Sequence, residues 1–278
     1  MARFDGKVAF ITGAARGQGR SHALRFAAEG ADVVLCDLGG DDLETVGYTL
    51  PTREDLEETK RLVEGIGRRA LAFPVDVRDG EQLIDAADQA LHAFGAIDVL
   101  VINAAICTFS ELAAMSRRVW DETLDVNLGG AFNTVRAVLP SMIERRSGSV
   151  VATASMAGRA GWETLGHYAA SKWGLIGLIK SLALEVASYG ITANVICPSG
   201  VNTPMANNER SFRLFRPDLE NPTVDDVLPA LAAMNVIPVP WVEPDDISDA
   251  VLFLASEEAS GITGATLAVA AGASARNI

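Results

Sequence analysis

Short hydrophobic runs alternate along the chain with longer segments in which apolar residues recur every three or four positions. The short runs are bounded by Gly, Asp or Pro, as buried parallel strands are, and the longer segments have the period of helices that pack on a sheet. The runs predict strands at residues 7–12, 32–37, 70–75, 97–102, 148–153, 192–197 and 265–270. The longer segments predict helices at residues 18–29, 53–65, 80–93, 116–145, 165–188 and 244–255.

Strands that alternate with helices predict an α/β fold with a parallel sheet, because the crossover helices cover both of its faces. The 278 residues, 49% of them hydrophobic, suffice for one Rossmann-type, doubly wound domain over residues 1–278. No repeat or low-complexity tract suggests another unit. We therefore predict a single domain built on one seven-stranded sheet.

Two predicted connections are much longer than the roughly 2–6 residues usual in α/β units. The first, residues 38–52, is an acidic, glycine-punctuated insert that could be a linker, a substrate loop or part of a cofactor site. The second, residues 198–244, begins with polar residues and continues with apolar and aromatic ones. We expect the second connection to form a substrate lid; packing against another subunit is the alternative for part of it.

Composition narrows the possible partners and compartments. A formal net charge of −13 leaves no excess of Lys and Arg for a phosphate-tracking face, so nucleic acid is not an expected partner. The cysteines Cys36, Cys107 and Cys197 form no CxxC pair, and with three histidines they suggest neither disulfides nor a metal site. The first apolar run is too short for a signal peptide, and no segment approaches a membrane span. We predict a soluble, cytoplasmic protein without a membrane partner.

A glycine-rich turn follows the first predicted strand and opens the first helix. Gly13, Gly17 and Gly19 would let the backbone approach a pyrophosphate, whose charge the helix dipole favours. Asp37 ends the second strand 18 residues after Gly19, close to the roughly 20 expected of an acid that binds an adenosine ribose. Its carboxylate favours NAD over NADP, whereas Arg16 could pair with a 2′-phosphate. We give Asp37 more weight because its charge would lie against that phosphate.

The ends of the third and fourth predicted strands extend this site. VDV at 75–77 and VINAA at 101–105 lie where an open α/β sheet binds its ligand. Asp76 is therefore a candidate for cofactor binding, and a helix cap is its alternative role.

Tyr168 and Lys172 lie four residues apart at the start of a predicted helix, so their side chains share a face. An exposed helical pair would have the same spacing. Ser155 favours a catalytic role for the pair, because it follows the fifth predicted strand and thus lies at the carboxyl edge of the sheet. The three side chains suit the oxidation of an alcohol, which needs a base for the hydroxyl proton while hydride leaves the carbon.

With these motifs the chain resembles the short-chain dehydrogenase/reductase family from end to end. TGAARGQG is similar to that family's TGxxxGxG, INAA to its NNAG and DVNL to its asparagine motif, and Ser155, Tyr168 and Lys172 match its catalytic triad. Three departures occur: Ile102 replaces the first Asn of NNAG, Ala105 replaces its Gly, and PSGVNTPM stands where PGxxxTxM is usual. The departures concern local geometry and leave the chemistry intact.

The resemblance implies a sheet order of 3-2-1-4-5-6-7 and a role for each site residue. Tyr168 would be the base, with its pKa lowered from about 10 by the charges of Lys172 and the nicotinamide. Lys172 would also hold the nicotinamide ribose, Ser155 would hydrogen-bond the substrate oxygen, and Asn127 would hold a water that relays protons. The predicted cofactor-binding residues are Gly13, Arg16, Gly17, Gln18, Gly19, Asp37, Leu38, Asp76, Val77, Asn103, Ala104, Ala105, Tyr168, Lys172, Val201 and Thr203.

The predicted substrate pocket is apolar, which favours a hydrophobic alcohol or ketone. Its candidate residues are Met156, Trp162, Met205, Phe212 and Phe215. Trp162 could equally be an anchor of the core. The sequence alone does not single out one compound.

Within the family, the insert and the segments ARGQGRSHA, NTPM and FRLFRPDLENPT resemble the actinobacterial carveol-dehydrogenase-like, mycofactocin-associated branch. That branch implies a secondary, monoterpenoid alcohol, an NAD that exchanges slowly and a mycofactocin-type electron acceptor. It also implies a homotetramer in which the helices at 116–145 and 165–188 pair across a two-fold axis. The alternatives are a 3-oxoacyl or other ketone reductase of the same family, and a dinucleotide-binding scaffold without turnover.

The insert starts beside Asp37 and ends at Thr52, which is placed to cap the next helix. We therefore predict that residues 39–51 fold over the adenosine half of NAD and slow its release. A substrate role for the insert is disfavoured, because the catalytic residues lie at the other end of the dinucleotide.

Overall fold

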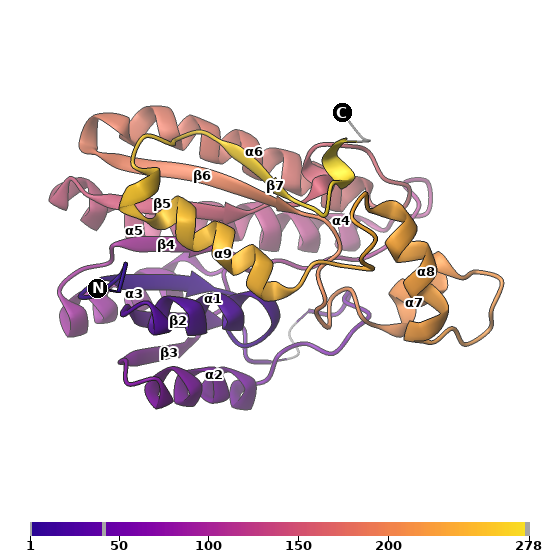
Figure 1. Ribbon diagram of the computed structural model, residues 1–278, viewed down its shortest axis with the longest axis horizontal. Helices are drawn as coiled ribbons and strands as arrows, with labels where there is room; N and C mark the ends of the chain where they lie inside the picture. Colours follow the sequence, from indigo (N-terminus) through magenta and orange to yellow (C-terminus); the bar gives the residue numbers. More distant parts are fainter. Residues whose placement is uncertain (1, 41–42, 276–278) are drawn as a thin grey trace.

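A computed structural model describes residues 2–40 and 43–275, and in this part of the chain seven parallel strands form one sheet (Figure 1). The strand order is β3-β2-β1-β4-β5-β6-β7, which confirms the predicted Rossmann-type, doubly wound fold. The strands are β1 (Val8–Thr12), β2 (Asp32–Asp37), β3 (Ala70–Pro74), β4 (Val99–Ile102), β5 (Gly148–Thr153), β6 (Ile191–Pro198) and β7 (Thr266–Val269). They lie within two residues of the predicted runs because fully buried parallel strands are continuously apolar.

Helices cover both faces of the sheet, as predicted. On one face lie α1 (Gly17–Ala28), α2 (Arg53–Gly65) and α9 (Pro244–Ala255). On the other face lie α3 (Gly80–Phe94), α4 (Arg117–Leu124), α5 (Gly130–Arg145) and α6 (Gly166–Val186). Thr52 caps α2 as predicted, since its hydroxyl accepts a hydrogen bond from the Asp55 backbone N–H at 3.1 Å.

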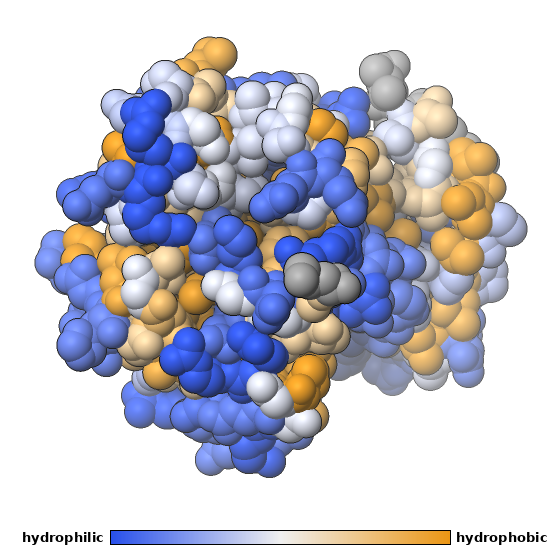
Figure 2. All heavy atoms as spheres, turned by 60° about the vertical axis from the view of Figure 1, so that its left-hand side comes forward, coloured by the Kyte–Doolittle hydropathy of each residue, from blue (hydrophilic) through white to orange (hydrophobic). Residues whose placement is uncertain are grey.

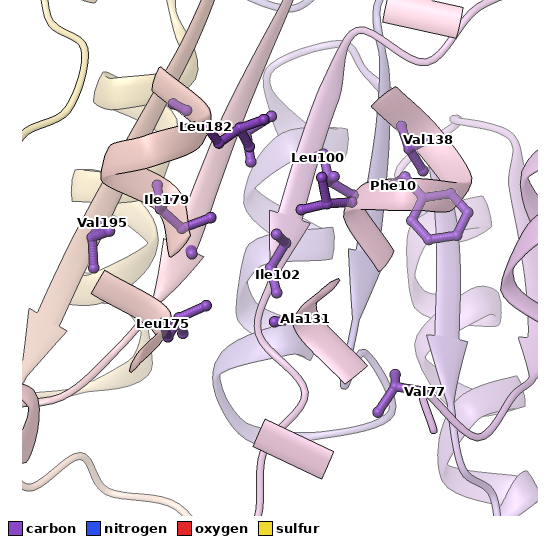
Figure 3. Close-up of a cluster of buried hydrophobic side chains, with 14 of the residues drawn as sticks. Phe10, Val77, Leu100, Ile102, Ala131, Val138, Leu175, Ile179, Leu182 and Val195 are labelled. Carbon is purple, nitrogen blue, oxygen red and sulfur yellow. The ribbon is translucent and has the colours of Figure 1, made fainter. Parts of the chain in front are cut away.

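The two faces of the sheet carry separate apolar cores, because successive strand residues point in opposite directions. In β1, Phe10 joins the core under α5 and α6, while Ile11 joins the core under α1 and α9. Figure 3 shows Leu100 of β4 between Val138 of α5 and Leu182 of α6. Each large side chain buried in this way contributes about 1.5–3 kcal/mol to stability. The cores hold the strand ends, and therefore the site above them, in fixed positions.

The predicted helix 116–145 is interrupted. After α4 the chain makes one wider, π-helical turn, Asp125–Gly129, before α5 begins. The side chain of Asn127 in this turn accepts a hydrogen bond from the Ile106 backbone N–H at 2.8 Å and donates to the Ile106 carbonyl at 2.9 Å. Such π-bulges occur where tertiary contacts compete with the regular helical ladder, frequently at functional sites.

The connection from residue 198 to 244 contains two helices that the sequence did not predict. They are α7 (Glu209–Phe215) and α8 (Val224–Met234), which project from one end of the sheet (Figure 1). Asn208 begins α7 by accepting a hydrogen bond from the Ser211 backbone N–H at 3.0 Å, and Thr223 forms a capping box with Asp226. Both caps are standard signals of a helix start.

The face shown in Figure 2 is mainly hydrophilic, with hydrophobic residues in scattered groups. Among the described helices none is both long and apolar enough to cross a bilayer. Within residues 2–40 and 43–275, no three His, Cys, Asp or Glu side chains are grouped in a way that could hold a metal ion.

Candidate active site

One cavity of about 710 Å³ lies at the carboxyl ends of the strands. The glycine turn after β1 lines one part of it, and Ser155, Tyr168 and Lys172 line another. The insert and the connection that carries α7 and α8 contribute the remaining walls. Most of the predicted cofactor and catalytic residues therefore line one continuous space.

The glycine turn is shaped for close approach of a ligand. Gly13 and Gly17 have φ angles of 69° and 56°, in the left-handed region that side chains disfavour. A Cβ on Gly19 would lie 1.9 Å from the carbonyl oxygen of Gly13, so only glycine fits where α1 crosses the turn. Arg16 precedes α1 without capping it through its side chain, which leaves the first N–H groups of the helix to bind an anion such as a pyrophosphate.

Asp37 ends β2 with a buried carboxylate beside this turn. Its two oxygens accept hydrogen bonds from the backbone N–H groups of Ala15 and Leu38, each at 2.8 Å. Burial raises the pKa of Asp37, while these two hydrogen bonds and the charge of Arg16 oppose the rise. The oriented carboxylate retains lone pairs that could accept ribose hydroxyls, as predicted from its position.

Arg16 makes a contact that its sequence position did not predict. Its guanidinium donates a hydrogen bond to the carbonyl oxygen of Thr49, in the insert. The side chain thus joins the glycine turn to the insert, and a 2′-phosphate is not needed to explain a basic residue there.

The other strand ends complete the cofactor side of the cavity. Asp76 lines it, but it forms an ion pair with Arg78 at 2.5 Å, and α3 is capped by Asp79 instead. Asn103 donates from its amide to the carbonyls of Thr12 and Gly13 at 3.1 and 3.2 Å and so holds the glycine turn. The predicted cofactor residues that also line the cavity are Gln18, Leu38, Val77, Ala104, Ala105, Val201 and Thr203. Gly19 packs against the backbone of Gly13 in the turn and does not line the cavity.

Two elements bring the catalytic side chains together. Ser155 follows β5, and its hydroxyl accepts a hydrogen bond from the Ala157 backbone N–H at 3.1 Å. Tyr168 and Lys172 lie in the first turns of α6, on one face as predicted. The Lys172 ammonium lies 5.7 Å from the centroid of the Tyr168 ring and donates to the carbonyl oxygen of Thr153 at 2.9 Å.

The pKa of Tyr168 moves in the direction opposite to the prediction. Burial is the main cause that raises it, and a hydrogen bond with Ser155 opposes the rise only in part. Burial also lowers the pKa of Lys172, to about 8. The predicted lowering includes the positive charge of the bound nicotinamide, whereas in the chain alone the cost of removing Tyr168 and Lys172 from water dominates their pKa values.

Asn127 is buried, 1% exposed, and does not line the cavity. Besides its two hydrogen bonds with Ile106, its amide donates to the hydroxyl of Ser171 at 3.1 Å. Ser171 precedes Lys172 on α6, so Asn127 ties the π-helical turn to the catalytic helix. Its role in a water relay stays a prediction.

Most of the predicted substrate residues lie on the cavity. Met156, Trp162, Met205 and Phe215 line it, and Phe212 does not, although it belongs to the same helix as Phe215. Leu214, Leu231, Met234 and Trp241 also line the cavity and belong to the apolar part of the 198–244 connection, which was expected to form the substrate lid. The lining residues that the sequence did not indicate are Tyr48, Cys107, Phe109, Ser211 and Asn235.

The insert lines the cavity that holds the catalytic residues, although the sequence analysis disfavoured a substrate role for it. Tyr48 lines the cavity together with Tyr168 and forms a hydrogen bond with the backbone of Cys107. The extended chain spans up to about 3.3–3.6 Å per residue, so an insert of this length can cross from the end of β2 to the catalytic residues. Residues 41–42 of the insert lie outside the described part of the chain.

The cavity thus combines an anion-binding glycine turn with a group of side chains that can transfer a proton. These two features are typical of a Rossmann-type, nucleotide-dependent oxidoreductase. Comparison with known proteins agrees: the model of the short chain dehydrogenase family matches residues 7–214. The chain therefore belongs to the short chain dehydrogenase family.

Individual relatives are similar over nearly their whole length. The (-)-trans-carveol dehydrogenase of Rhodococcus erythropolis is 45% identical over 274 residues, 98% of this chain and 99% of the relative. The crystal structure of carveol dehydrogenase from Mycobacterium avium in complex with NAD is 45% identical, with a TM-score of 0.97 over 99% of this chain and 100% of that one. A short chain dehydrogenase from Mycobacterium paratuberculosis bound to NAD is 35% identical, with a TM-score of 0.89 over 98% and 99% of the two chains.

Proposed function

We propose that this protein, an NAD-dependent dehydrogenase acting on CH–OH groups, oxidises a hydrophobic secondary alcohol of monoterpenoid size to its ketone and catalyses the reverse reaction. The observation that carries the proposal is the single cavity that joins the glycine turn and Asp37 to Ser155, Tyr168 and Lys172. The similarity to carveol dehydrogenases over nearly the whole chain supports the substrate class.

Each catalytic side chain has a distinct task in this proposal. NAD supplies the hydride acceptor and, when oxidised, a positive charge. The Tyr168 hydroxyl oxygen takes the proton of the substrate alcohol, which requires its ionised form although burial raises its pKa. Lys172, the buried cation beside it, favours that ionised form, and Ser155 hydrogen-bonds the substrate oxygen as charge develops there.

The cavity walls favour an apolar substrate. Around the catalytic group they include Met156, Trp162, Met205, Phe215 and Leu231, and few polar groups would orient the ligand. A pocket of this composition takes its affinity from buried apolar surface and its orientation from the reacting oxygen.

The anchoring of the insert supports the proposal that NAD exchanges slowly. Leu43 and Leu50 are buried in the core under α5 and α6, and Arg16 holds the segment between them at Thr49. Release of a dinucleotide from beneath a wall fixed at three points would require these contacts to open together. A mycofactocin-type acceptor would then reoxidise the bound cofactor in place.

The test starts from the absorbance of the purified protein, which reveals bound nucleotide. Carveol and other secondary alcohols are then added. We expect reduction of bound NAD without continued turnover until an artificial electron acceptor is supplied. Steady release of NADH into solution would contradict slow exchange, and no reduction by any alcohol would contradict the proposed activity.

We also propose a homotetramer in which α5 and α6 pair with their copies. Large apolar side chains on these helices support it: Leu184 is 85% exposed, Trp173 55% and Phe132 49%. Exposed apolar area of this kind on neighbouring helices is typical of surfaces that another chain covers. Sedimentation of the purified protein tests the stoichiometry, and a monomer at micromolar concentration would contradict it.

A further inference from the structure

The insert carries an aromatic side chain into the substrate end of the cavity. Tyr48 lines the same space as Ser155 and Tyr168, although it lies in the connection that follows the adenosine side of the sheet. Burial is the main cause that raises the pKa of Tyr168, and the nearby Tyr48 adds to the rise. Tyr48 therefore lies on the same cavity as Tyr168 and interacts with it electrostatically, while the rest of the insert contacts other elements.

The loop after β4, which the Tyr48 hydroxyl contacts, is held in place by several hydrogen bonds. The Tyr48 hydroxyl is hydrogen-bonded with the backbone of Cys107, which lies in this loop. The residues around Cys107 are anchored from three directions. The Ile106 backbone is held by Asn127, the Thr108 hydroxyl lies 2.7 Å from Nε2 of His167, and the Phe109 carbonyl accepts a hydrogen bond from Arg210 at 2.8 Å. The loop that Tyr48 contacts is thus held in place by neighbouring elements.

The rest of the insert fixes the ring from the other side. Val46 and Tyr48 pack against the core under α5 and α6, and Leu50 is buried in that core. Thr45 is hydrogen-bonded to Glu122 of α4, and Gly47 lies so close to Arg210 of α7 that a Cβ there would be 2.7 Å from the guanidinium. With both its backbone and its hydroxyl held, Tyr48 has little room to rotate away from an incoming ligand.

We propose that Tyr48 is a specificity-determining residue, whose ring forms the wall of the substrate cavity beside Tyr168 and limits the bulk of the alcohol that can bind there. This inference rests on the proposed alcohol dehydrogenase activity. A fixed ring selects by shape, because a substrate that overlaps it cannot displace the insert without breaking several contacts at once.

The experiment compares Tyr48→Ala and Tyr48→Phe with the parent protein, using cyclohexanol and 4-tert-butylcyclohexanol as a small and a bulky probe. We expect Tyr48→Ala to raise the ratio of kcat/KM for the bulky over the small alcohol by about 10-fold. Tyr48→Phe keeps the ring and should return the ratio to within about 3-fold of the parent value. The bound NAD of all three proteins should be equal.

Tyr189→Ala is the matched control, because Tyr189 packs on Arg146 and does not line the cavity. It removes the same side chain elsewhere and should leave the ratio unchanged. Binding of the two corresponding ketones to the NAD-loaded proteins, measured by thermal shift, gives the same ratio without turnover. A parent protein that oxidises neither alcohol would therefore contradict the proposed activity and still leave the size selectivity measurable.

Three results would overturn the role of Tyr48. The first is an unchanged ratio in Tyr48→Ala by both kinetics and binding, and the second is the same ratio in Tyr48→Phe as in Tyr48→Ala. The third is an equal loss of kcat/KM for both alcohols together with a loss of bound NAD, which would assign Tyr48 to cofactor retention.

Discussion

The two long connections that wall the cavity are attached to the sheet in different ways. The insert after β2 has no helix in its described residues and is fastened along its length, by the ion pair of Glu44 with Arg118 at 2.6 Å and by the bond from Arg16 to Thr49. The connection after β6 forms a parallel bridge at its base, between Val201 and Val242, and its two helices project from there. Beyond the base it is held by separate contacts, such as the hydrogen bond from Arg210 of α7 to the Phe109 carbonyl and the backbone bond from Val236 to Ala271.

This difference suggests a division of labour. A segment held at many points along its length moves only when many contacts break, whereas a helix pair joined to the rest of the chain by a few contacts can move as a unit once these open. We therefore expect the insert to act as a fixed wall for cofactor and substrate, and α7 and α8 to act as the lid that admits the alcohol. The following predictions test this contrast, in order of decreasing effect.

The largest effect should come from Tyr168, which lies on the cavity that both connections line. Tyr168→Phe removes the hydroxyl that takes the substrate proton, and loss of such a group costs about 10²–10⁴-fold in rate. We expect hydride transfer to fall by about 10³-fold while NAD stays bound, as measured by single-turnover reduction of the bound nucleotide. Retained activity would contradict the assignment of Tyr168 as the base.

A second effect should appear in the pH dependence of stability. Lys172 is 2% exposed and has a pKa of about 8, against 10.5 for the ordinary side chain. Between these values the unfolded chain binds more protons than the folded one, so the Lys172 contribution to the free energy of unfolding rises with pH from about 8 to 10.5. The gain is about 3 kcal/mol at most, at 1.36 kcal/mol per pKa unit.

Lys172→Met isolates this contribution. Urea unfolding of the NAD-free protein between pH 7 and pH 10.5 should show a difference between the two proteins that shrinks as the pH rises. A difference that is constant with pH would contradict the lowered pKa of Lys172.

Replacing residues 39–51 with a short Gly-Ser link tests the fixed wall directly. If this segment holds the cofactor, the NAD off-rate should rise by about 10-fold or more, equivalent to about 1.4 kcal/mol. Displacement of bound NAD by an excess of a labelled analogue measures the rate. An unchanged off-rate would contradict the retention role of the insert.

The smallest effect should come from the lid. Phe215→Ala shortens a cavity-lining side chain of α7, and we expect the KM for the alcohol to rise by about 3- to 10-fold with kcat little changed. The NAD off-rate should stay at the parent value, in contrast to the insert replacement. A faster NAD release in Phe215→Ala would contradict the assignment of cofactor retention to the insert and of substrate entry to α7 and α8.

The cofactor side of the site was predictable because its signals are local. Gly13 and Gly17 precede a helix directly after an apolar run, and Asp37 ends the next run. Each of these features depends on a few neighbouring residues and on the rule that ligands bind at the carboxyl ends of parallel strands.

The missed features depend on contacts between distant residues. The π-helical turn at Asn127 exists because its amide bonds to Ile106, 21 residues away in the sequence. The pKa of Tyr168 depends on burial, which no spacing of charged residues reveals. Tyr48 belongs to a segment without periodicity, so nothing local indicates where along the cavity its ring lies.

The sequence by itself determined the alternation of strands and helices, the glycine turn and the Tyr168 and Lys172 pair, because buried strands, tight turns and helix faces require particular residues at short, regular intervals. The tertiary structure decided where the insert runs, how α7 and α8 project and how strongly the catalytic pair is shielded from water. These properties follow from packing and desolvation, which sum over residues that are neighbours only in the folded chain.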